Sequence, residues 1–259
     1  KSKSRLGAFS LDVIRRDYQL GSDTWTAGDL TFTIFSPVES APDPGRTSRS
    51  VQQAVYRPSV IAELTIDNRN GRRARRAFFG YAGGGSTDSM RWFDGPGMTG
   101  IAKGSRTGIF CDDASVRSAQ GFHAESILTE KHQQTHKEGL GGTGLLLLSV
   151  PAGQRKTFHF AICFFRGGIV TTGMPTRYWY SRFFADLESV GRYSLSHFAD
   201  IRRRALASNR LIASRKLNEA QRFQMIHAIR SYYGSTQLLD CRGKPVWVVN
   251  EGQYRMLNT

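Results

Sequence analysis

The chain has 259 residues, of which 39% are apolar, and its 16 Phe, 9 Tyr and 4 Trp can build a sizeable core, which excludes an intrinsically disordered protein. Its net charge of +15 suggests nucleic-acid binding, but the basic residues are scattered and no nucleic-acid-binding motif accompanies them, so we expect no nucleic-acid partner. No apolar run approaches the roughly 18 residues of a membrane-spanning helix, and no secretion signal is visible, so we expect a cytoplasmic protein without a membrane partner.

Strands are predicted over residues 25–169, where apolar residues recur with a period of two. The segments 29–35 and 60–66 carry apolar residues on both faces, which indicates strands buried between the two layers of a sandwich. We expect four side chains to be buried in its core: Phe32, Leu64, Phe160 and Ile162.

Two hairpins are expected within this sandwich. The turn-forming residues 68–71 favour a return of the strand 60–66 through 75–81, and the turn at 151–154 favours pairing of 145–150 with 156–165. The basic run from Arg69 to Arg76 is expected on the surface. The glycine-rich segments 83–85 and 94–97 are expected to form long surface loops.

The pattern changes to helical spacing after Pro175, which predicts helices over 178–190 and 194–216. A third helix is predicted to begin at Asn218, where Gln221 completes a capping box, and to end at Gly234. A short β-rich run follows at 246–249.

The expected fold is therefore mainly β, with a large antiparallel β-sandwich at 1–174, a helical linker at 175–235 and a further segment at 236–259. We expect the chain to be a fragment of a longer protein. Apolar residues of the last helix, such as Phe223 and Ile226, are then expected to be partly bare.

Most familiar kinds of chemical site find no support in the sequence. His123, His132 and His136 lack the fixed spacing of a metal site and are expected on the surface, so we expect no metal. The cysteines are three, far apart and without Cys-x-x-Cys spacing, which favours free thiols in a reducing compartment: Cys111, Cys163 and Cys241. No serine lies in a Gly-x-Ser-x-Gly elbow, and no glycine-rich phosphate motif or other cofactor motif is present.

The segment 244–256 is the most informative for function, because an apolar run ends there at a polar cluster. The cluster comprises Asn250, Glu251, Tyr254 and Arg255. A carboxylate that acts as a glycosidase nucleophile must stay ionised and be held rigidly, and neighbouring Arg, Tyr and Asn side chains supply charge and hydrogen bonds. On the residues alone, an ordinary ion pair is the more frequent explanation of such a cluster. Trp247, within the apolar run, is expected in the core more readily than against a sugar ring.

The sequence Gly-Lys-Pro-Val-Trp-Val-Val-Asn-Glu-Gly-Gln-Tyr-Arg-Met-Leu-Asn-Thr at 243–259 resembles the nucleophile-bearing stretch of glycoside hydrolase family 52 β-xylosidases. Further blocks agree in the same order, at 23–38, 74–80, 116–119, 165–168 and 227–234. The resemblance implies an N-terminal β-sandwich joined by helices to a C-terminal α/α barrel, which the chain would enter at residue 236 and leave truncated.

The resemblance also implies a retaining enzyme that releases xylose from the non-reducing ends of β-1,4-xylo-oligosaccharides by double displacement, without a cofactor. By position, Glu251 corresponds to the nucleophile, while the general acid/base is an Asp of the barrel, outside this chain. Asn250, Tyr254 and Arg255 are expected to support Glu251 and to bind substrate. The implied partners are the xylo-oligosaccharide and the C-terminal barrel, and a homodimer is left open. The basic run at 69–76 is expected to lie away from Glu251.

Two other functions are kept as alternatives. A non-catalytic carbohydrate-binding β-sandwich module would present exposed aromatic residues on a completed surface. A nucleic-acid-binding domain would lose affinity steeply with salt and would be indifferent to xylose.

Overall fold

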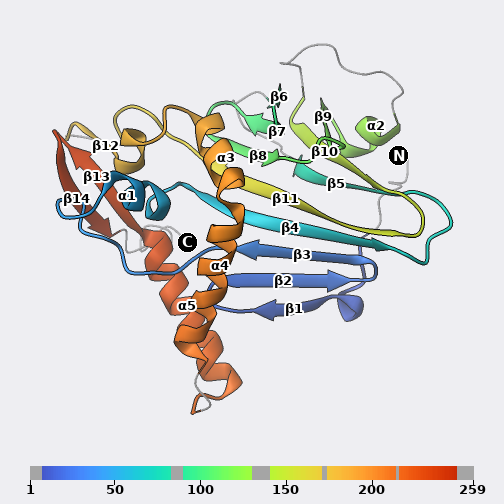
Figure 1. Ribbon diagram of the computed structural model, residues 1–259, viewed down its shortest axis with the longest axis horizontal. Coiled ribbons are helices and arrows are strands. Elements are labelled where there is room, and N and C mark those ends of the chain that lie inside the picture. Colours follow the sequence, from blue (N-terminus) through green and yellow to red (C-terminus); the bar gives the residue numbers. More distant parts are fainter. Residues whose placement is uncertain (1–7, 83–89, 130–140, 171–173, 214–215, 250–259) are drawn as a thin grey trace, which may run out of the picture.

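The computed structural model of the protein describes residues 8–82, 90–129, 141–170, 174–213 and 216–249. These residues form three antiparallel sheets with helices beside them, so the predicted mainly β fold is confirmed (Figure 1). Their α-helices are α1 (Arg49–Val55), α2 (Ala124–Thr129), α3 (Leu187–Ser196), α4 (Phe198–Ser208) and α5 (Glu219–Ser235). Short 3₁₀ turns occur at η1 (Leu11–Val13), η2 (Trp179–Arg182) and η3 (Asn209–Ile212).

The largest sheet has eight strands, and the first four in spatial order are also consecutive along the chain. In spatial order they are β1 (Arg15–Tyr18), β2 (Ser22–Ala27), β3 (Leu30–Phe35), β4 (Ser59–Asn68), β11 (Gln154–Phe164), β8 (Thr107–Cys111), β7 (Met98–Lys103) and β6 (Met90–Gly95). The late strand β11 therefore lies at the centre, between β4 and β8.

A three-stranded sheet packs against one face of the large sheet. Its strands are β5 (Arg75–Ala82), β10 (Thr143–Val150) and β9 (Arg117–Gly121), with β10 in the middle. The ring of Phe79 on β5 lies 5.1 Å from the rings of both Phe32 and Phe160 on the large sheet, so side chains of the two layers interdigitate. The predicted two-layer sandwich is confirmed.

The core between the layers contains the side chains that the alternation predicted. Leu64 and Phe160 are buried, while Phe32 and Ile162 are half-buried and pack against the same cluster. Burial of a side chain of this size contributes roughly 1.5–3 kcal/mol. The strand register inferred from the sequence is therefore confirmed at these positions.

The two predicted hairpins are wrong, because each turn carries the chain from one sheet to the other. β5 pairs with β10 and not with β4, whereas β11 pairs with β4 and β8. The side-chain amide of Asn68 joins the two crossings by donating to the carbonyls of Arg73 (2.9 Å), Val150 (3.0 Å) and Pro151 (2.9 Å). Strands with one apolar face can lie in either layer, and packing of these faces across the core decides the pairing.

The segment 94–97 is a tight turn, and the expected long loop is wrong there. It joins β6 to β7 as a hairpin, with Gly97 at a φ of 68°. The other glycine-rich segment, 83–85, lies outside the described residues. Arg69, Arg72, Arg73 and Arg76 are exposed, as expected, and Arg75 is half-buried against Asp29 at 2.5 Å.

The predicted helix over 178–190 is also wrong. Tyr178 ends strand β12, and α3 begins only after Asp186, whose carboxylate accepts a hydrogen bond from the Ser189 amide in a capping box. The segment 194–216 likewise divides, since α3 ends at Ser196 and α4 follows. α3 and α4 lie across the outer face of the large sheet, where α3 packs on Phe110 (Figure 1).

The third helix, α5, begins as predicted. Asn218 and Gln221 form both hydrogen bonds of the capping box. Gly234 lies inside the helix, which ends at Ser235, so the predicted end differs by one residue. Ile226 is buried against Leu20 and Ile212, whereas Phe223 is 51% exposed. The expectation of bare apolar residues holds for Phe223 and is wrong for Ile226.

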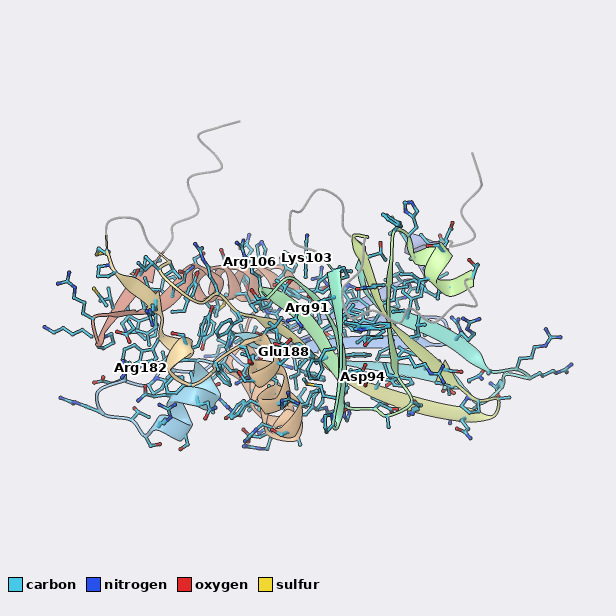
Figure 2. All side chains as sticks on the ribbon, turned by 90° about the horizontal axis from the view of Figure 1, so that it is seen from above. Arg91, Asp94, Lys103, Arg106, Arg182 and Glu188 are labelled. Carbon is cyan, nitrogen blue, oxygen red and sulfur yellow. The ribbon has the colours of Figure 1, made fainter. Side chains whose placement is uncertain are left out.

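Ion pairs attach the helical segment to the strands on either side. Arg91 of β6 lies 2.5 Å from Glu188 of α3 (Figure 2). Arg182 of η2 lies 2.7 Å from Asp240 of the hairpin that follows α5. The division into a linker at 175–235 and the start of a barrel at 236–259 stays a prediction.

The three cysteines are free, as predicted. Burial raises the pKa of the Cys111 thiol to about 12 and also raises the pKa of Cys163, so both behave as small apolar core residues. In the described part of the chain, no helix is long and apolar enough to cross a membrane.

Candidate active site

A third sheet leads the chain to the predicted nucleophile. It consists of β12 (Thr176–Tyr178), β13 (Thr236–Cys241) and the edge strand β14 (Lys244–Val249). β13 and β14 form a hairpin whose turn residues Arg242 and Gly243 have positive φ angles of 53° and 87°. The Asp240 carboxylate accepts the Gly243 amide at 2.6 Å, which fixes this turn.

All four predicted site residues lie outside the described residues: Asn250, Glu251, Tyr254 and Arg255. Their roles therefore stay predictions. Val249, the last described residue, pairs with Thr236 at the start of β13. The exposed basic run at 69–76 follows β4 at the end of the sandwich far from β14 (Figure 1).

The expected surface position of the three histidines can be examined only in part. His132 and His136 lie outside the described residues, and His123 is exposed at the start of α2. Within the described ranges, no three His, Cys, Asp or Glu side chains come together as metal ligands would.

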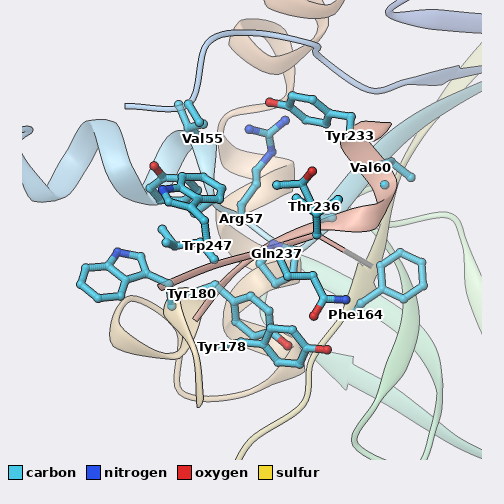
Figure 3. A pocket seen from close by; sticks show the side chains of 18 of the residues that line it. Val55, Arg57, Val60, Phe164, Tyr178, Tyr180, Tyr233, Thr236, Gln237 and Trp247 are labelled. Carbon is cyan, nitrogen blue, oxygen red and sulfur yellow. The ribbon is translucent and has the colours of Figure 1, made fainter. Parts of the chain in front are cut away.

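Val249 lines a pocket of about 880 Å³, within the usual size range of ligand sites (Figure 3). The pocket lies between the third sheet, the end of α5, the end of β11 and the segment after α1. Its aromatic lining residues are Tyr56, Phe164, Tyr178, Trp179, Tyr180, Tyr232, Tyr233 and Trp247.

The aromatic rings are held in fixed orientations. Tyr178 and Tyr180 stack with centroids 5.0 Å apart and an interplanar angle of 9°. The indole of Trp179 donates to the buried Gln52 at 2.9 Å, and the guanidinium of Arg182 lies 4.5 Å above its ring. Trp247 is 46% exposed and its ring lies 6.1 Å from that of Tyr56, so its expected place in the core is wrong.

Several polar groups complete the lining. Burial raises the pKa of the Tyr56 and Tyr180 phenols to about 12, so both stay neutral over a wide pH range. The Tyr56 hydroxyl donates to the Pro42 carbonyl, and the Tyr180 hydroxyl accepts the Arg166 amide. Arg57 is the charged group, and burial lowers the pKa of its guanidinium to about 10. Gln237 and Ser59 add further hydrogen-bonding groups.

Sequence reasoning missed this pocket except for Trp247. Its residues come from segments far apart along the chain, and the only local signal is the grouping of aromatic residues at 178–180 and 232–233. These aromatic groups at the ends of elements could have been named as candidate binding residues, but nothing in the sequence shows that they lie together in the fold.

The family model described as "Glycosyl hydrolase family 52" matches residues 1–259. The chain belongs to glycosyl hydrolase family 52. A "Beta-xylosidase" of Geobacillus stearothermophilus is 48% identical over 253 residues, which cover 97% of this chain and 36% of that relative. A second "Beta-xylosidase" of the same organism is 36% identical over 259 residues, covering 97% of this chain and 41% of that relative. The chain thus spans about two fifths of the length of these curated relatives.

Family membership confirms the resemblance inferred from the segment 243–259. The lining of the pocket combines aromatic faces with phenol, amide and hydroxyl groups. No Asp or Glu is among its described lining residues. The pair of carboxyl groups that a glycosidase requires is therefore not among the described lining residues.

Proposed function

We propose that the protein to which this chain belongs is a retaining β-xylosidase that releases xylose from the non-reducing ends of β-1,4-xylo-oligosaccharides. Family membership and the names of the two relatives support this activity. The structural observation that carries the proposal is the place of Val249, which lines the aromatic pocket and stands two residues before Glu251.

The proposed reaction is a double displacement at the anomeric carbon. The Glu251 carboxylate attacks that carbon while a second carboxyl group protonates the leaving oxygen, which gives a covalent glycosyl-enzyme. The second group then deprotonates a water molecule, whose attack releases xylose and frees Glu251. Retention requires the two carboxyl groups to lie about 5–5.5 Å apart.

We assign the second carboxyl group to an Asp of a C-terminal α/α barrel, in the part of the protein that this chain does not cover. Asn250, Tyr254 and Arg255 are proposed to hold Glu251 and contact the sugar. The aromatic pocket would then bind sugar units next to the reacting bond, and no cofactor enters the reaction.

The test is Glu251→Ala in the full-length protein, assayed on an aryl β-xyloside. We expect loss of the nucleophile to reduce kcat by more than about 10³-fold, because the covalent glycosyl-enzyme can no longer form. Azide or formate should partly restore turnover by occupying the place of the missing carboxylate. Glu219→Ala, an exposed residue at the start of α5, is the matched control and should leave kcat unchanged.

A second candidate function is a non-catalytic carbohydrate-binding module. The aromatic lining without a described Asp or Glu favours it. It predicts that Glu251→Ala changes neither xylosidase turnover nor sugar affinity, so near-native activity of this variant would reject the assignment of the nucleophile.

A further inference from the structure

Arg57 is an unusual lining residue for a neutral sugar site. The residue is only 8% exposed, although it carries a full positive charge. Its Nη1 donates to the carbonyl of Ala54 at the end of α1, while its Nε has no acceptor among the described residues. Within the described ranges, no carboxylate forms an ion pair with it.

The carboxylates that act electrostatically on Arg57 are paired directly with other arginines. Glu39 favours the Arg57 charge but is held by Arg204, whose Nε donates to it at 2.9 Å. Arg204 itself repels the Arg57 guanidinium, and Asp200 is engaged by Arg203 and Arg204. A buried cation without a directly paired anion is costly, since burial removes its hydration, and here the Ala54 carbonyl replaces only part of it.

Arg57 belongs to the wall of the pocket that a ligand would enter. Arg57 lines the pocket together with Tyr233 and Thr236 (Figure 3). Tyr233 is close enough for the guanidinium to lower the pKa of its phenol, although burial raises that pKa overall. Tyr233 donates to the Glu39 carbonyl at 3.0 Å and is thereby fixed beside Arg57.

We propose that this pocket binds a carboxylate-bearing sugar, a uronic acid unit carried by a xylo-oligosaccharide, with Arg57 as the receptor for its carboxylate. The inference rests on the proposed function and specifies its substrate class. The planar guanidinium matches the two oxygens of a carboxylate, and the aromatic faces match the sugar ring. A neutral xylose unit would leave Arg57 without a direct ion-pair partner, so the pocket should prefer the acidic ligand.

The first experiment measures binding and does not depend on turnover. Xylotriose with one glucuronic acid branch and unbranched xylotriose are titrated calorimetrically into the full-length Glu251→Gln protein. Glucuronamide-branched xylotriose, which has the shape of the acid without its charge, serves as the ligand control. We expect the acid to bind at least about 10-fold more tightly than either neutral ligand, from the strength of a charge-assisted hydrogen bond.

The second experiment changes the receptor. Arg57→Gln should weaken binding of the acid about 10- to 100-fold and leave binding of unbranched xylotriose within about twofold, while Arg57→Lys should be intermediate. Arg72→Gln, at an exposed arginine of the sandwich, is the matched control for net charge and should change neither affinity. Circular dichroism verifies that each variant is folded.

Equal affinity of the unaltered pocket for acid, amide and neutral ligand would overturn the inference, and this comparison needs no Arg57 variant. An equal loss for acid and neutral ligands in Arg57→Gln would also overturn it and would assign Arg57 to holding the pocket together. If Glu251→Ala retains xylosidase activity while the acid still binds preferentially, the proposed reaction fails and the ligand class stands.

Discussion

Asn68 shows how one side chain can fix a connection that its sequence neighbourhood does not reveal. Its sequence context predicts a turn, and the structure adds three hydrogen bonds from its amide to carbonyls of both sheet crossings. Its own carbonyl accepts the amides of Gly71 and Gly153, each at 3.0 Å. A single residue thus satisfies backbone groups of two segments that are distant in sequence, and only the folded pairing brings them together.

The substitution Asn68→Asp keeps the shape of this side chain and removes its donors. We expect it to lower the free energy of unfolding by about 2–4 kcal/mol, because a buried carboxylate would face three carbonyl oxygens. Urea unfolding followed by circular dichroism measures the change. Asn70→Asp, at an exposed position of the same turn, is the control, and a similar small effect for both variants would contradict the role assigned to Asn68.

At the scale of elements, patterns among neighbouring residues predicted those strands and helix ends that depend mainly on neighbouring residues. Alternation identified β3, β4 and β11 because each buries side chains on both faces, and the Asn218 capping box fixed the start of α5. Strand partners could not be predicted, since β5 and β10 pair with each other across distant sequence. The break before α3 was missed because the Asp186 cap lies within an otherwise helical apolar pattern.

The candidate site was likewise predictable only in part. Its sequence motif at 243–259 identified the family, because a motif of contiguous residues can be recognised without knowledge of the fold. The pocket is assembled from ends of elements, such as Tyr56 after α1 and Tyr178 at the end of β12, and its discovery needed the tertiary structure. Arg57 was missed because burial without an ion-pair partner is a property of the fold.

Two helical glycines should respond oppositely to alanine. Gly191 of α3 faces the buried ring of Phe110, which an added Cβ would approach to 2.7 Å, and a Cβ added at Gly108 would approach the same ring to 2.9 Å. Gly191→Ala should therefore destabilise the protein by about 1–3 kcal/mol despite a better helix propensity. Gly234 of α5 has nothing within 4 Å of an added Cβ, so Gly234→Ala should stabilise by about 0.5 kcal/mol.

Thermal unfolding of the two variants beside the unaltered protein measures both signs. If Gly191→Ala is as stable as Gly234→Ala, α3 is free to shift on the large sheet and the tight contact with Phe110 does not limit it.

At the scale of the whole molecule, the pocket and the exposed apolar residues of α5 indicate where further contacts form. α5 is fully buried only at Ile226, while Phe223, Met225 and Tyr232 are 51%, 41% and 64% exposed. Tyr232 also lines the pocket, and Met225 lies two helical turns before it on the same face of α5. Exposed apolar residues beside a pocket often meet a partner, and we propose the barrel domain in that role.

This arrangement predicts that the 259-residue chain, expressed alone, has no measurable xylosidase activity. A missing general acid removes about 10²- to 10⁴-fold from the leaving-group step, and loss of the opposite wall of the pocket removes substrate positioning as well. The purified chain is assayed on an aryl β-xyloside against its Glu251→Gln variant as the blank and the full-length protein as the positive control. Circular dichroism first establishes that the isolated chain is folded. Turnover above the blank would place a complete catalytic pair within these 259 residues and reject an acid/base in a further domain.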